Sequence, residues 1–487
     1  MQKKIAFILG PLFFALLLWA KPFETLSDQG HAVLATTVWI ALWWIAEVIP
    51  IAATALLPIV LFPLSGGMDL PTTTASFGHK YVFLYLGGFL IAIGIEKWNL
   101  HRRIALNIIS FIGSDVRKII LGFMTATAFL SMWISNTATS VMMLPIGMAI
   151  IKQLKDNPNT LEDENLIFGK ALMLAIAYSA SIGGIATLIG TPPNLVLAGV
   201  IQSIYGYEIT FLEWFLFGFP IALGMLFFCW FYLTRYAFHF KQTEFPGGRE
   251  EIERLKQELG PISFEEKRVG IIFGLAAICW ITRSFLLQPL FPMIDDTIIA
   301  ILFGLLLFVL PASKKSTALI DWKDTLHLPW GIILLFGGGM ALAKAFETSG
   351  LAIWLGELMT AFGNLPLIVL ILLLVTAVNF LTEITSNLAT TAMLLPVLAP
   401  LALEIGVHPY GLMVGAAIAA SCAYMLPVAT PPNAVVFGSG YLRIPDMVTK
   451  GLVMNLFSIL LITIMVYLLL PLLWNIKLDQ FPEVFLK

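Results

Sequence analysis

The sequence SNTATSVMMLPI at residues 135–146 returns as SNLATTAMLLPV at residues 386–397, and seven of the twelve aligned positions are identical. A second motif follows each copy, because the tetrapeptide TPPN lies at Thr191–Asn194 and again at Thr430–Asn433. The copies are 251 residues apart for the first motif and 239 apart for the second. Two motifs that recur in the same order at nearly the same spacing indicate an internal duplication.

A third feature precedes each copy, namely a glycine pair in an apolar run. It reads LGGFL at 86–90 and FGGGM at 336–340, an offset of 250 residues. The duplicated unit therefore contains three features in one order. In a membrane protein, such repeats are typical of secondary transporters, whose binding sites lie where the repeats meet.

The composition identifies a membrane protein. Mean hydropathy is +0.90, and 12% of the residues are charged, whereas a soluble globular chain carries about 25%. Apolar stretches long enough to cross about 30 Å of hydrocarbon recur along the whole chain. The net charge of −2 and the lack of a basic tract argue against a nucleic-acid partner. The fold class that follows is an all-α polytopic membrane protein.

Nine apolar stretches are predicted to be continuous spans. The first follows Lys3 and Lys4 and lacks a small-residue cleavage pattern, which predicts a membrane helix with a cytoplasmic N-terminus rather than a signal peptide. The nine stretches are 5–20, 31–49, 51–64, 81–97, 210–236, 269–289, 295–311, 331–347 and 447–474.

The apolar stretches that carry the repeated motifs are predicted to be interrupted. Residues 119–151 and 365–404 each resemble a hairpin of two half-helices with the Ser-Asn pair at its tip. Residues 166–202 and 410–441 each resemble one helix broken by TPPN, because proline lacks an N–H group and clashes with the preceding helical turn. Non-helical backbone at membrane depth persists only where it lines a site or is buried in protein.

Basic residues fall on one side of this arrangement, which the positive-inside rule assigns to the cytoplasm. The polar segment 239–268 lies on that side and is predicted to be a connector with an amphipathic helix at Gly248–Leu259. The first unit then starts outside and the second inside, so the two units are inverted and their hairpins enter from opposite sides. The basic residues are Lys3, Lys4, Arg102, Arg103, Arg117, Lys118, Arg249, Arg254, Lys256, Lys267, Arg268, Lys314 and Lys315.

The polar groups at the hairpin tips suit both an anion and a cation. Hydroxyl and amide groups donate and accept hydrogen bonds. The half-helix after each tip points free N–H groups back at it, which attracts an anion. Two such tips match the two ends of a dicarboxylate. Carbonyl groups of broken helices, together with hydroxyl and amide oxygens, can coordinate sodium.

The motif segments contain no permanent cation. No Lys or Arg lies in 119–151, 179–200, 382–396 or 421–441. A doubly charged anion inside a membrane is costly unless its charge is paired. Co-bound sodium ions are the simplest counter-charge, so the sequence favours cation symport over plain anion exchange.

One competing interpretation treats these polar residues as contacts between helices, each worth about 0.6–2 kcal/mol. Two copies, each followed by a broken helix, favour a binding site instead. Glu383 lies three residues before Ser386 and is predicted to tune the site rather than to bind an ion.

These motifs, together with SCAYMLPVATPPNAVVFGSG at 421–440, resemble the divalent anion:sodium symporter family, which includes the INDY-type dicarboxylate transporters. The resemblance covers nearly the whole chain. It implies a homodimer of protomers with about eleven spans and two re-entrant hairpins in inverted repeats, placed in the bacterial cytoplasmic membrane. It implies elevator-type symport of C4-dicarboxylates such as succinate, fumarate or malate, with Na+ as coupling ion and no organic cofactor.

The resemblance also implies residue roles. Sodium is assigned to Ser131, Ser135, Asn136 and the backbone near Gly184, and to Thr382, Thr385, Asn387 and the backbone near Ala429. The substrate is assigned to Asn136, Thr137, Ser386, Asn387, Thr430 and Pro431. One departure from the family pattern is Leu388, where many members have threonine. This departure leaves the preferred substrate open.

The implied domains alternate along the chain. They are a scaffold domain at 1–110 and 269–362, a transport domain at 111–238 and 363–487, and the connector at 239–268. Several alternatives stay open: a sulfate or tricarboxylate carrier, a sodium-independent dicarboxylate exchanger, an intramembrane enzyme, and a channel. The sequence lacks paired membrane aspartates and a zinc motif, which argues against an enzyme. Broken helices in inverted repeats favour alternating access over a channel.

Overall fold

Helices build this structure, a computed structural model that describes residues 2–113, 115–153, 164–240, 248–313, 318–358 and 365–486. Within these ranges, the β contact is an isolated bridge between Pro311 and Ala318. In the described part of the chain, eight helices are long and apolar enough to span a membrane, and four shorter apolar helices accompany them. The predicted all-α polytopic membrane fold is confirmed.

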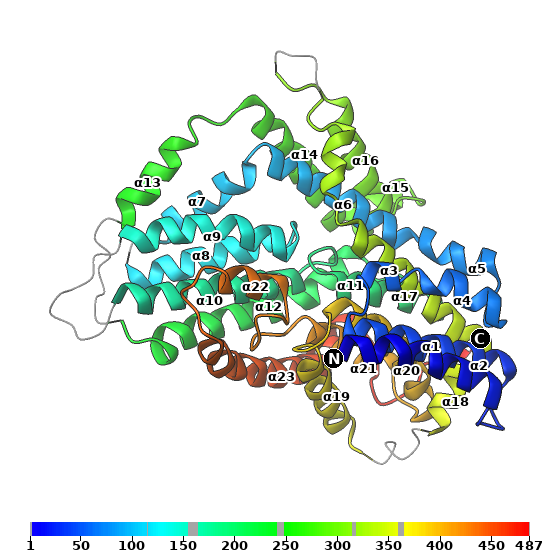
Figure 1. Cartoon of the computed structure of the whole chain (residues 1–487). Coiled ribbons are helices and arrows are strands. Elements are labelled where there is room, and N and C mark those ends of the chain that lie inside the picture. Colours follow the sequence, from blue (N-terminus) through cyan, green and yellow to red (C-terminus); the bar gives the residue numbers. More distant parts are fainter. Residues whose placement is uncertain are drawn as a thin grey trace.

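Two series of seven consecutive helices follow the same order on either side of the connector (Figure 1). Each series begins with the helix that carries the glycine pair and ends with a long apolar helix. The first series is α6 Lys80–Lys97, α7 Leu100–Ile112, α8 Val116–Ser131, α9 Asn136–Gln153, α10 Glu164–Ile185, α11 Pro192–Tyr205 and α12 Phe211–Tyr232. The second is α17 Trp330–Ser349, α18 Leu351–Leu358, α19 Leu367–Leu381, α20 Asn387–Glu404, α21 Pro409–Ala420, α22 Pro431–Phe437 and α23 Ile444–Trp474.

The remaining helices precede each series. They are α1 Gln2–Ala20, α2 Asp28–Ala46, α3 Ile51–Thr54, α4 Leu57–Ser65 and α5 Leu70–Ala75 before the first, and α13 Gly248–Glu258, α14 Phe264–Thr282, α15 Gln288–Leu290 and α16 Asp296–Val309 before the second. The predicted amphipathic helix of the connector is confirmed as α13, which buries Ile252 and Leu255. The predicted cytoplasmic Lys314 and Lys315 lie outside the described residues.

The prolines refine two predicted elements. The predicted span at residues 51–64 is a short apolar helix at Ile51–Ser65, with a turn at Ala55 and Leu56 between α3 and α4. Pro58 lies in the first turn of α4, where its missing N–H costs nothing. For the same reason the break in each predicted broken helix ends at TPPN rather than inside it. Its threonine is the extended N-cap, and its first proline starts α11 or α22.

The two repeats interlock through their broken helices. Each hairpin packs on the broken helix of its own repeat, α8 and α9 on α10, and α19 and α20 on α21. The helix that follows each break packs on the other repeat. Helix α22 of the second repeat packs on α9 and α10, and helix α11 of the first repeat packs on α20 and α21. Figure 1 shows α8 and α9 toward one end of the molecule and α18 and α20 toward the other. The hairpin tips and helix breaks are therefore held where the repeats meet.

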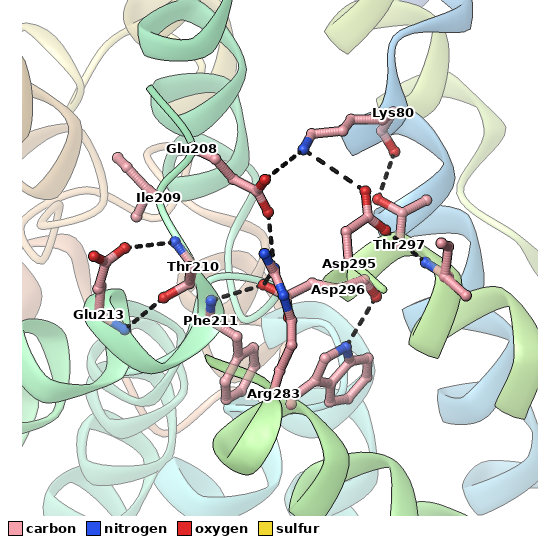
Figure 2. Close-up of polar contacts among 12 residues, drawn as sticks. Lys80, Glu208, Ile209, Thr210, Phe211, Glu213, Arg283, Asp295, Asp296 and Thr297 are labelled. Atoms are coloured by element: carbon pink, nitrogen blue, oxygen red, sulfur yellow. Dashed lines mark hydrogen bonds and ion pairs between the residues drawn. The ribbon is translucent and has the colours of Figure 1, made fainter. Parts of the chain in front are cut away.

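A cluster of charges joins the loop between α11 and α12 to α6, to α16 and to Arg283, the residue that follows α14 (Figure 2). Glu208 Oε2 lies 3.0 Å from Lys80 Nζ, and Glu208 Oε1 lies 2.8 Å from Arg283 Nη1. Arg283 Nη1 also lies 3.0 Å from Asp296 Oδ2, which accepts a hydrogen bond from the Phe211 N–H. Burial raises the pKa of Glu208, but its bonds to Lys80 and the charge of Arg283 lower it further, to below its ordinary value.

Candidate functional site

The first hairpin tip gathers three oxygen atoms. Ser131, the last residue of α8, is buried, and its Oγ lies 2.6 Å from both Asn136 Oδ1 and the Ala180 carbonyl oxygen. Asn136 starts α9, so its side chain stands at the helix N-terminus. The amide also lies against Gly184, where an added Cβ would be 2.7 Å from Asn136 Oδ1. Only glycine allows this approach, so Ser131, Asn136 and Gly184 are neighbours in the structure.

The second tip repeats this geometry. Thr382 is buried, and its Oγ1 lies 2.7 Å from Asn387 Oδ1 and 2.9 Å from the Ala420 carbonyl oxygen. Thr382 and Asn387 lie 251 residues after Ser131 and Asn136, and Ala420 lies 240 after Ala180. Each tip therefore presents a set of three oxygens, one hydroxyl, one amide and one carbonyl, which we call the oxygen trio. The two carbonyls were missed by sequence reasoning, because a backbone oxygen leaves no residue signature.

Other predicted sodium ligands have different contacts. Ser135 Oγ accepts a hydrogen bond from the Ala138 N–H at 3.2 Å, which caps α9. Thr385 Oγ1 contacts the Leu381 carbonyl and the Thr390 hydroxyl at 2.8 and 2.6 Å. The structure therefore places Thr385 in a hydroxyl pair of its own beside the second trio.

The predicted substrate residues differ in exposure. Thr137 and Pro431 are exposed, and Asn136, Ser386 and Asn387 are half-buried. Thr430 is 4% exposed, and its Oγ1 accepts a hydrogen bond from the Asn433 N–H at 3.3 Å. The side chains at the tips are therefore accessible. Thr430 is instead the buried N-cap of α22, directly before the exposed Pro431. Buried Ala429 ends the second break, and its N–H donates to the Leu426 carbonyl.

The residue that departs from the repeat pattern is buried. Leu388 is 4% exposed and belongs to the apolar core, whereas its repeat counterpart Thr137 is exposed. The leucine side chain therefore stabilises the packing of α20 rather than facing an open tip. A hydroxyl at this position would require a buried hydrogen-bond partner.

Glu383 anchors the second break. Its buried carboxylate accepts hydrogen bonds from the N–H groups of Tyr424, Met425 and Leu426 at 2.8–3.2 Å, and from Asn455 Nδ2 at 2.8 Å. No cation pairs with it among the described residues. The carboxylate is therefore held by three backbone N–H groups of the break and by the Asn455 amide.

The first repeat closes its break without a carboxylate. The position equivalent to Glu383 is Met132, 251 residues earlier. Its carbonyl accepts a hydrogen bond from Thr187 Oγ1 at 2.5 Å, and the helix end closes by a bond from the Ala186 N–H to Gly183. Helix α21 ends at Ala420, earlier in its repeat than α10, which ends at Ile185. Residues 424–426 therefore lie outside the helix, and their N–H groups bind Glu383 instead of helical carbonyls.

The chemistry of the two tips suits a hard monovalent cation. Hydroxyl, amide and carbonyl oxygens are neutral ligands of the kind that binds Na+ at broken membrane helices. The described residues contain no cluster of three His, Cys, Asp or Glu that would hold a transition metal. The helix N-termini of α9 and α20 add N–H groups and positive dipole ends that favour an anion.

Comparison with known proteins identifies the family of the chain. The family model of the sodium:sulfate symporter transmembrane region matches residues 2–476. The chain belongs to the divalent anion:sodium symporter family. A sodium-dependent dicarboxylate transporter of Staphylococcus saprophyticus is 47% identical over 482 residues, covering 98% of this chain and 93% of the relative. A relative of the same description from Staphylococcus aureus USA300 is 47% identical over 483 residues, with the same coverage.

Solved structures share the fold of this family member. Neisseria gonorrhoeae MtrF matches with a TM-score of 0.58 at 12% identity, covering 93% of this chain and 97% of MtrF. The Alcanivorax borkumensis YdaH transporter matches with a TM-score of 0.55 at 14% identity, covering 90% and 97%. The chain is thus an integral membrane protein of a transporter family with a transporter fold.

Proposed function

We propose that this family member is a sodium-coupled symporter of C4-dicarboxylates such as succinate, fumarate and malate. The observation that carries the proposal is the pair of matched oxygen trios, one at each hairpin tip. Each trio supplies a partial coordination shell for one Na+. The relatives at 47% identity are described as sodium-dependent dicarboxylate transporters, which supports the same ion and substrate class here.

The substrate would bridge the two tips. Thr137 is exposed beside Asn136 at the start of α9, and Ser386 and Asn387 are half-buried at the start of α20. Each carboxylate would meet polar groups at one helix N-terminus, with Thr430 and Pro431 bordering the pocket. Because the motif segments carry no Lys or Arg, two bound Na+ would balance the two negative charges.

We further propose an elevator movement in a homodimer of the bacterial cytoplasmic membrane, with the N-terminus inside. The surface between the two proposed domains supports this movement. Gly88 of α6 faces Ile189 of the first break, and Gly339 of α17 approaches Ala392 of α20. Glycine and alanine at these contacts allow the helices to approach closely. Few interlocked side chains would then have to separate when one domain slides along the other. The Glu208 cluster would separate at the same boundary.

Replacing sodium with choline is expected to abolish concentrative uptake of labelled succinate into proteoliposomes. A succinate dianion alone would be repelled by an inside-negative potential, at about 2.3 kcal/mol per charge per 100 mV. Two coupled Na+ balance the charge of the dianion, and the sodium gradient then supplies the free energy for accumulation. The measurement is uptake with and without a sodium gradient, against unlabelled succinate, malate, fumarate, citrate and sulfate. Equal accumulation in the two media would favour the sodium-independent exchanger, and competition by sulfate or citrate alone would reassign the substrate.

Joining the two proposed domains at the charge cluster is expected to arrest transport. Lys80→Cys with Glu208→Cys places one thiol on each side of an ion pair whose charged atoms lie 3.0 Å apart, so a bifunctional methanethiosulfonate linker that replaces the length of the two lost side chains should join them. Uptake should then stop and return after addition of a reducing thiol. The matched control is Tyr207→Cys with Glu213→Cys, a contact of 3.0 Å inside one domain. Full uptake by the bridged Lys80 and Glu208 variant would refute separation at this boundary.

A further inference from the structure

The asparagine that ends each TPPN motif is buried and binds the backbone of the preceding break. Asn194 is the third residue of α11 and is 0% exposed. Its Nδ2 lies 2.8 Å from the Thr187 carbonyl, 3.2 Å from the Gly184 carbonyl and 3.4 Å from the Ile185 carbonyl. These carbonyls lie at or beyond the end of α10, where the helix supplies no further N–H groups to bind them.

The second repeat makes two of these three contacts. Asn433 is the third residue of α22 and is 0% exposed, and its Nδ2 lies 3.2 Å from the Ala423 carbonyl and 3.0 Å from the Leu426 carbonyl. Both carbonyls lie 239 residues after Gly184 and Thr187, the offset that also relates the two asparagines. A contact kept atom for atom in two repeats of different sequence indicates a requirement of the shared site.

We infer that Asn194 and Asn433 are positioning residues for the two sodium sites, an inference that rests on the proposed function. Each side-chain amide adds a donor to carbonyls of the break, of which the Thr187 and Leu426 carbonyls also accept from the Gly190 and Ala429 N–H groups at 3.3 and 3.2 Å. The amide is the donor that links such a carbonyl to the helix after the break. The Gly184 carbonyl keeps a second lone pair, which it can offer to a cation beside Asn136. The side-chain oxygens of both asparagines have no partner among the described residues, so their carbonyl contacts alone set the orientation of the amides.

Direct coordination through the side-chain oxygen is the competing role, and aspartate distinguishes the two. Asn194→Asp keeps the shape and an oxygen but loses the N–H donors, so a positioning role predicts weaker sodium binding. A ligand role predicts binding that is unchanged or tighter, because the added negative charge attracts the cation. Asn194→Ala removes both the oxygen and the donors. The same substitutions at Asn433 provide an independent pair.

The experiment measures the sodium concentration that gives half of the maximal thermal stabilisation of the purified protein, together with the sodium dependence of succinate uptake. Both aspartate variants should need about tenfold or more sodium in both assays, since a bond to each carbonyl is lost. Asn165→Ala is the matched control. It removes a side-chain amide bond of 2.8 Å to the Ile151 carbonyl, away from both tips, and should keep the wild-type midpoint.

The outcomes separate this inference from the proposed function. A wild-type protein that sodium does not stabilise would overturn the proposed function, and this inference with it. A wild-type response that both aspartate variants retain at the same midpoint would overturn the inference alone. Tighter sodium binding by the aspartate variants would also overturn it and make the asparagines ligands. The alanine variants bury no charge, so an unchanged sodium midpoint in them would overturn the inference even where the aspartate variants fail to fold.

Discussion

Asn136→Ala and Asn387→Ala are each expected to reduce sodium-driven succinate uptake by about a hundredfold or more. Each asparagine supplies an oxygen of its trio, bonded at 2.6 or 2.7 Å to the neighbouring hydroxyl, and begins the half-helix that faces the substrate. The substitution removes one oxygen ligand of the ion and one hydrogen bond to a carboxylate, and the hydrogen bond alone is worth about 1.5–3 kcal/mol. Every 1.4 kcal/mol is about tenfold in affinity.

Uptake and sodium-dependent stabilisation should be measured on both variants beside Asn107→Ala, which alters an exposed asparagine of α7. Expression and monodispersity should stay at the wild-type level, because both tip asparagines are half-buried rather than part of the apolar core. Wild-type uptake and an unchanged sodium midpoint in either tip variant would return the Ser-Asn motifs to the role of contacts between helices.

The duplication carried most of the fold information. Repeated Ser-Asn and TPPN motifs located both hairpins and both broken helices, because a polar tip and a proline pair are local signals that the chain cannot place inside a continuous span. The position of each break was harder to predict. Proline was taken as the interruption, whereas the structure uses it to start the next helix, where a missing N–H is harmless. The actual gap precedes the threonine N-cap.

The candidate site was predictable only where side chains define it. Ser131 and Asn136 with their counterparts Thr382 and Asn387 come together as expected. The Ala180 and Ala420 carbonyls could not be assigned from residue type, since every residue has one. Asn194 and Asn433 were visible in the sequence as the last letters of TPPN. The two asparagines are 239 residues apart. Their recurrence at the same place in both repeats is the sequence signal that could have marked them as functional residues.

Glu383→Gln is expected to weaken the second sodium site selectively and to destabilise the folded protein by about 2–4 kcal/mol. Glutamine retains one acceptor oxygen but turns an NH2 group toward N–H donors that now bind a carboxylate, at Tyr424, Met425 and Leu426. Charge-assisted bonds are roughly twice as strong as neutral ones. The same bonds hold the break that follows Ala420, whose carbonyl belongs to the second trio, so the geometry of that trio is disturbed as well.

The asymmetry between the repeats makes this prediction specific. Met132 is the counterpart of Glu383 in the first repeat, so Met132→Leu should leave sodium binding and stability near wild type. In Glu383→Gln, thermal unfolding should occur at a lower temperature, and the sodium dependence of uptake should become less cooperative as one site fails before the other. A variant that loses stability but keeps the wild-type sodium midpoint would limit Glu383 to holding the break. An equal loss at both sites would refute the assignment of Glu383 to the second trio, because its bonds in this structure all go to the second repeat.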